Sequence, residues 1–146
     1  NFLDDKGMRS VNDLRGRAIG AYSEWGDLDL NYKVAAHIDP QKCIGCDLCL
    51  VACRDSSVDC IHTGAHPLPA GHRAPTRDAA IARAAGSGVK VTWADWDECT
   101  GCNLCSHVCP VPGCITMVDD TRGKPFESWN DRIAKGTARV PGGLHD

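Results

Sequence analysis

Two quartets of cysteines with identical internal spacing constrain this chain more than any other feature. In each quartet the first three cysteines are separated by two residues, and the fourth follows after three more. The quartets are Cys43, Cys46, Cys49 and Cys53, and then Cys99, Cys102, Cys105 and Cys109. Aspartate, glycine and leucine recur in register around them, as in Gly45 and Gly101. Two copies of one unit predict a fold with pseudo-two-fold symmetry.

The spacing C-x-x-C-x-x-C-x-x-x-C is that of bacterial ferredoxins with two clusters. There, three close cysteines ligate one [4Fe–4S] cluster and the fourth ligates the other cluster. We therefore expect two [4Fe–4S] clusters with crossed ligands. The first set is Cys43, Cys46, Cys49 and Cys109, and the second set is Cys99, Cys102, Cys105 and Cys53. Zinc is the weaker alternative, because three cysteines this close crowd a single tetrahedral ion. A disulfide framework is disfavoured because no secretory signal is present.

Residues around the quartets also fit this interpretation. Gly45 and Gly101 fall where a Cβ atom would intrude on a tight loop. The residues after the second cysteines, Asp47 and Asn103, are the non-glycine types that best tolerate positive φ.

Two cysteines and several histidines remain outside the quartets. Cys60 and Cys114 each precede an isoleucine at the start of an expected strand, so we interpret them as buried neighbours of the clusters and not as ligands. For the histidines we expect solvated or packing roles, with one of them beside a cluster; they are His62, His66 and His72, and, beside the cluster, His107.

The chain is expected to be an α+β dicluster ferredoxin of βαββαβ type, with an N-terminal arm and a C-terminal tail. Strands are predicted at 33–38, 89–93 and 114–118. In each repeat a short helix should begin after the third cysteine of the quartet and contain the fourth. Residues 62–75 are predicted as loop, followed by a helix over 77–85 that Thr76 caps and Gly86 ends. Capping boxes are predicted at Ser10 with Asp13 and at Ser128 with Asp131. The expected organisation is an arm at 1–33, the ferredoxin domain at 34–61 and 89–118, an insertion at 62–88 and a tail at 119–146.

Composition narrows the class of protein. With 146 residues and 5% aromatic residues, a large apolar core is not expected, and metals would supply stability. The formal net charge of −3, without a basic run, argues against nucleic acid as a partner. No apolar run long enough for a membrane span and no signal peptide is present, so we expect a cytoplasmic protein without a membrane partner. Two oxidised clusters at about −2 each would make it more acidic and favour partners with positive docking surfaces.

The motifs and their flanks resemble the C-terminal ferredoxin-like part of the dihydropyrimidine dehydrogenase family, above all the bacterial subunit that also carries an FMN barrel. The similar segments are 43–46, 99–111 and 114–118, together with 1–16, 25–33 and 128–130. As in that family, proline follows Cys109 but not Cys53. Residues 62–90 are longer than is usual in the family. Arg54 departs from the expected acidic or amide residue, and a cation there should raise the potential of a nearby cluster.

This resemblance implies an electron-transfer part of an enzyme that reduces uracil and thymine to dihydropyrimidines. Electrons would pass from NAD(P)H through FAD and the clusters to FMN. This chain has no G-x-G-x-x-G motif and is too short for a barrel. We therefore expect FMN, FAD and NAD(P) only on partner domains or chains, within an oligomer, and no catalytic residue in this chain.

Two alternatives remain open at this stage. The chain could be a free-standing ferredoxin with two [4Fe–4S] clusters that serves another oxidoreductase. The extended arm, and a first residue that is not Met, favour the dehydrogenase module. In the second alternative the clusters only stabilise a binding module, although paired clusters usually conduct electrons.

Overall fold

The computed structural model describes residues 2–138 in two compact units. Tyr32–Lys124 form one unit, and the described residues on either side of it form the other. The larger unit contains both cysteine quartets.

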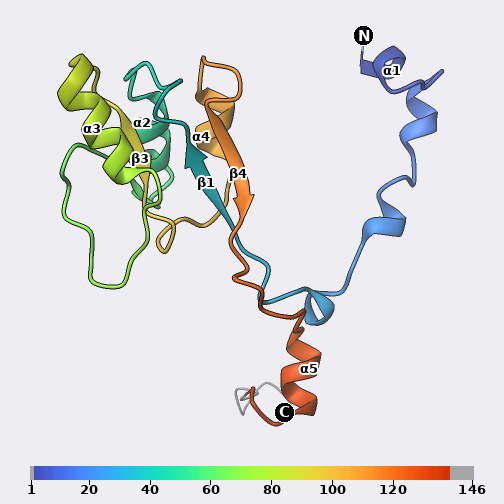
Figure 1. The fold of residues 1–146 in the computed structure, drawn as a ribbon. Coiled ribbons are helices and arrows are strands. Elements are labelled where there is room, and N and C mark those ends of the chain that lie inside the picture. The colour runs from blue at the N-terminus through green and yellow to red at the C-terminus, as the bar shows by residue number, and fades with distance from the viewer. Residues whose placement is uncertain (1, 139–146) are drawn as a thin grey trace. The chain divides into compact units, whose positions relative to one another are not determined.

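The larger unit consists of two short antiparallel sheets connected by helices (Figure 1). In chain order its elements are β1 (Val34–Ile38), α2 (Leu48–Asp55), β2 (Ile61–Thr63), α3 (Arg77–Ser87), β3 (Thr92–Ala94), α4 (Leu104–Val108) and β4 (Ile115–Asp119). Strand β1 pairs with β4, and β2 pairs with β3. The first strand of each repeat thus pairs with the last strand of the other repeat. The predicted α+β dicluster ferredoxin fold is confirmed.

The two cluster-proximal helices begin earlier than predicted, and one of them also ends before its fourth cysteine. Both begin one residue before the third cysteine, directly after Asp47 and Asn103, which adopt the predicted positive φ of 60° and 65°. Helix α2 contains Cys53, but α4 ends at Val108 and leaves Cys109 in an extended conformation. The reason is Pro110, because the residue before a proline is disfavoured in helical geometry. No proline follows Cys53, so α2 continues to Asp55.

The insertion between the repeats is more ordered than the sequence suggested. Its first two residues extend strand β2 to Thr63. Helix α3 runs through Gly86 to Ser87, and the terminating residue is Gly88, with φ of 70° and its N–H donating to the Ala84 carbonyl. The prediction that Gly86 ends this helix was therefore wrong. Thr76 does occupy the N-cap position, but its side chain makes no capping hydrogen bond.

Polar contacts fasten this insertion to the ferredoxin repeats. The Arg83 guanidinium donates to the Cys43 carbonyl oxygen at 2.7 Å and also to the Pro40 carbonyl. The His72 Nδ1 atom lies 2.7 Å from the buried Asp95 carboxylate, and this hydrogen bond raises the pKa of His72. Arg83 thereby supports the loop that carries the first quartet, and His72 holds Asp95, whose carbonyl accepts from the Cys99 N–H ahead of the second quartet.

The core of the larger unit is small and rich in sulfur. Seven of its sixteen buried apolar residues are cysteines, and Trp93 is the only fully buried aromatic side chain among the described residues. The remaining core consists of small and β-branched side chains from the strands. So thin a core agrees with the expectation that bound metal contributes to stability.

The smaller unit contains short helical elements. These are α1 (Phe2–Asp5), η1 (Val11–Leu14), η2 (Ile19–Ala21), η3 (Trp25–Asp27) and α5 (Trp129–Ala134). Both predicted capping boxes are confirmed, at Ser10 with Asp13 and at Ser128 with Asp131. Within residues 2–138, no helix combines the length and the apolar character that crossing a membrane requires.

Candidate metal centres

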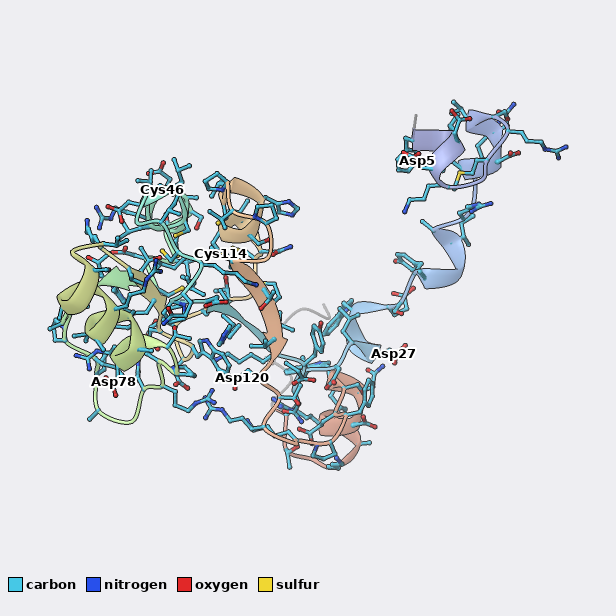
Figure 2. All side chains as sticks on the ribbon, turned by 45° about the horizontal axis from the view of Figure 1, so that its top comes forward. Asp5, Asp27, Cys46, Asp78, Cys114 and Asp120 are labelled. Atoms are coloured by element: carbon cyan, nitrogen blue, oxygen red, sulfur yellow. The ribbon has the colours of Figure 1, made fainter. Side chains whose placement is uncertain are left out.

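The first cysteine-lined cavity lies between the two repeats. It is lined by three cysteines of the first quartet, the fourth cysteine of the second, and one cysteine outside the quartets. These are Cys43, Cys46, Cys49, Cys109 and Cys114. Figure 2 shows Cys46 on the loop before α2 and Cys114 at the approach to β4.

The second cavity repeats this arrangement with the roles of the repeats exchanged. Its cysteines are Cys99, Cys102, Cys105, Cys53 and Cys60. In both cavities the fourth cysteine comes from the opposite repeat. The structure therefore groups the thiols in the same sets that the sequence predicted as ligands.

Two glycines allow the repeats to approach closely enough to form these cavities. Gly45, with φ of 71°, lies against the backbone of Lys90, where an added Cβ would fall 2.4 Å from the carbonyl oxygen. Gly101, with φ of 73°, lies against Val34 in the same way, at 2.8 Å from its carbonyl oxygen. Each glycine packs on the segment that opens the other repeat. Their positions explain why both cluster loops require glycine.

The donor set fits a [4Fe–4S] cluster in each cavity. Four thiolates are its standard protein ligands, and four quartet thiols border each space. One cysteine of each set is exposed, Cys46 in the first and Cys102 in the second, while the others are buried or half-buried. Within residues 2–138, no three His, Cys, Asp or Glu side chains are arranged to hold a single metal ion.

Cys60 is a hydrogen-bond partner of the second set. Its Sγ atom lies 3.5 Å from Cys53 Sγ, and its backbone N–H donates to the same sulfur at 3.3 Å. The hydrogen bond from the Cys60 thiol lowers the pKa of both Cys53 and Cys99 to about 6, and the pKa of Cys60 itself is raised. Cys60 is therefore a hydrogen-bonding neighbour of the quartet thiols in the second set.

Cys114 occupies the corresponding place in the first cavity. It is 3% exposed, and burial together with the charge of Cys109 raises its pKa to about 12. The interpretation of both extra cysteines as buried residues near the cavities agrees with this geometry.

Removal of these two thiols gives the first testable expectation. Cys60→Ala and Cys114→Ala should each retain the about eight irons of two [4Fe–4S] clusters, because each cavity keeps its four quartet cysteines. Iron and acid-labile sulfide analysis of anaerobically purified protein measures this. A loss of about half the iron in either variant would make that cysteine a ligand.

The histidines do not contribute to either cavity lining. The His62 and His66 rings stack with centroids 4.1 Å apart, and His62 also packs against Trp93. His107 is exposed and lies 3.4 Å from the Asn103 side chain, so its expected place beside a cluster is not supported. These histidines therefore pack against neighbouring side chains or lie in solvent.

Arg54 also differs from its expected role. Its side chain is 65% exposed and lies 3.6 Å from the Asp59 carboxylate. Solvent and this partner both weaken the field of the guanidinium. The expected increase in cluster potential from Arg54 is correspondingly reduced.

Sequence reasoning overlooked two residues at the first cavity. The Thr92 hydroxyl lies 3.5 Å from Cys49 Sγ and 3.8 Å from Cys43 Sγ. Arg83 donates to the Cys43 carbonyl from helix α3. The repeat offered a signal for Thr92, because aligning the two quartets makes it the counterpart of Ala36. Arg83 had no such signal, because it lies in the insertion.

Comparison with known proteins identifies similar sequences. Residues 36–117 match the model of a family described as "4Fe-4S dicluster domain". The NAD-dependent dihydropyrimidine dehydrogenase subunit PreA of Escherichia coli strain K12 is 30% identical over 125 residues, as is that of Escherichia coli O157:H7. These alignments cover 80% of this chain and 23% of each relative. The chain thus spans less than a quarter of the length of these curated relatives.

Proposed function

Because the chain belongs to the 4Fe-4S dicluster domain family, carrying two [4Fe–4S] clusters and transferring electrons through them, we propose that it is the electron relay of a dihydropyrimidine dehydrogenase. In this role it would connect an FAD site that is reduced by NAD(P)H with an FMN site at which uracil or thymine is reduced. Both flavins would belong to partner domains or chains. No residue of this chain would contact the pyrimidine.

The observation that carries this proposal is the extent of the similarity to PreA. The dicluster family model covers 82 of the 146 residues, whereas the PreA alignment covers 80% of the chain. The similarity therefore includes flanking residues that a dicluster domain by itself does not account for. A free-standing ferredoxin has no need for such flanks.

The ligands that we propose for the clusters follow from the cavities. Cys43, Cys46, Cys49 and Cys109 would hold the first cluster, and Cys99, Cys102, Cys105 and Cys53 the second. Bound clusters supply one-electron transfer. The chain's own residues position the quartet thiols, bury Cys60 and Cys114 beside them, and leave one cysteine of each set near solvent.

The relay is tested by breaking one cluster in the assembled enzyme. Cys102→Ala should abolish uracil-dependent consumption of NADH, because electrons can no longer pass through the second cluster, while FMN remains bound. Steady-state turnover and flavin content are the measurements. As a control, the isolated chain should accept and donate electrons but neither oxidise NADH nor reduce uracil, since it contains no dinucleotide motif and no barrel.

Turnover of Cys102→Ala near the parent rate would make the clusters structural. If uracil-dependent NADH consumption is absent even with all clusters and both flavins present, the free-standing ferredoxin is the better description.

A further inference from the structure

One buried position breaks the equivalence of the two cavities. Thr92 begins β3. When the two repeats are aligned on their quartets, its counterpart in the first repeat is Ala36 in β1. Both residues line their cavities and are almost completely buried, at 0% and 1% exposure. Thr92 presents a hydroxyl to the sulfurs of Cys49 and Cys43. Ala36 presents only a methyl group, which cannot donate a hydrogen bond.

The sulfurs of the second set have donors of another kind. The Cys60 backbone N–H donates to Cys53 Sγ at 3.3 Å, and Cys60 Sγ lies 3.5 Å from the same atom. Thr100 also lines the second cavity, but it is exposed, and in residues 2–138 its hydroxyl makes no hydrogen bond to a cysteine sulfur. Within residues 2–138, a buried hydroxyl beside a cysteine sulfur is thus a feature of the first cavity alone.

The chemistry of ligation fixes the direction of the Thr92 hydrogen bond. A cysteine that binds iron is a thiolate and has no proton, so the hydroxyl must donate to it. Reduction adds negative charge to the cluster and its thiolates, and the hydrogen bond becomes stronger in the reduced form. Burial excludes competing water and makes this difference larger. A donor at this place therefore raises the cluster's reduction potential.

Charged groups of both signs also lie near the first cavity. Arg83 donates to the Cys43 carbonyl at 2.7 Å. The Asp47 carboxylate lines the same cavity and pairs with Lys90 Nζ at 2.7 Å. Their opposite signs leave the Thr92 hydroxyl as the group with a single expected direction.

We propose that Thr92 raises the reduction potential of the cluster held by Cys43, Cys46, Cys49 and Cys109. The electron that this cluster accepts arrives from a reduced flavin, and no bond or proton is transferred with it. This inference rests on the proposed ligand sets, but not on the identity of the final electron acceptor.

Three variants of the full chain with its clusters test the inference. Thr92→Val keeps the shape and removes the donor, Thr92→Ser keeps the donor, and Ala36→Ser adds a donor at the equivalent position. Midpoint potentials are measured by redox titration monitored by electron paramagnetic resonance, with iron content and spin quantitation to establish that both clusters are present.

The parent should show two separate one-electron steps. In Thr92→Val one step should move to lower potential by about 59 mV, which is a tenfold change in the ratio of oxidised to reduced cluster for a one-electron couple, and the other step should not move. Thr92→Ser should retain the parent values. Ala36→Ser should raise the step that Thr92→Val leaves in place.

Thr92→Val with both clusters intact and both steps unchanged overturns the inference, as does a shift of the same step in Thr92→Val and Ala36→Ser. If Ala36→Ser fails to fold, the pair of Thr92 variants decides. A fall in potential in Thr92→Ser as large as that in Thr92→Val would also contradict the inference, because the serine retains the donor.

Discussion

Cys53→Ala should lose the cluster bound by Cys99, Cys102 and Cys105, which lie in the other repeat, and keep the cluster nearest to it in sequence. The Cys53 thiol borders the second cavity and is absent from the lining of the first. Iron content should fall from about eight to about four, since each [4Fe–4S] cluster requires its four thiolates.

The exposed cysteines show which cluster has been lost. Cys46 belongs to the first set and Cys102 to the second, and both are exposed. Anaerobic alkylation followed by peptide mass spectrometry should label Cys102 in Cys53→Ala and leave Cys46 protected by its cluster. The matched variant Cys109→Ala should give the reverse pattern. Labelling of Cys46 in Cys53→Ala would refute the crossed assignment.

Local sequence signals predicted the parts of the fold that depend on a few neighbouring residues. The positive φ values of Asp47 and Asn103 and the two capping boxes were predictable because each is fixed within about one turn of chain. The repeat in turn predicted the pseudo-symmetric α+β fold. Equivalent segments in both halves have to make equivalent contacts.

One local signal was overlooked. The difference in length between α2 and α4 follows from Pro110, which keeps Cys109 out of the helix.

Features that depend on long-range packing were predicted less well. The end of α3 at Gly88 depends on which of two glycines adopts the left-handed conformation. The support of the Cys43 loop by Arg83 joins residues 40 positions apart. A single sequence does not show such contacts, because propensity describes only the local chain.

Gly45→Ala should prevent the first cavity from forming, and its effect should exceed that of substitution at any open glycine. The new Cβ would lie 2.4 Å from the Lys90 carbonyl oxygen, a backbone atom that cannot move aside without displacing the segment ahead of β3. The positive φ of 71° adds strain of about 1–2 kcal/mol for a non-glycine residue. Together these should reduce the free energy of unfolding by roughly 3 kcal/mol or more, in a domain whose apolar core is thin.

Two further alanine variants separate the clash from the strain. Gly88 has nearly the same φ, 70°, but an added Cβ meets nothing within 4 Å, so Gly88→Ala should cost only about 1 kcal/mol. Gly101→Ala should fall between them, because its nearest contact at 2.6 Å is the Val34 side chain, which can adjust, and the carbonyl oxygen is 2.8 Å away. Thermal unfolding and iron content of the three holoproteins, compared with the parent, give the ranking. Equal effects of Gly45→Ala and Gly88→Ala would mean that backbone strain alone matters and that the close approach of the Cys43 loop to Lys90 does not.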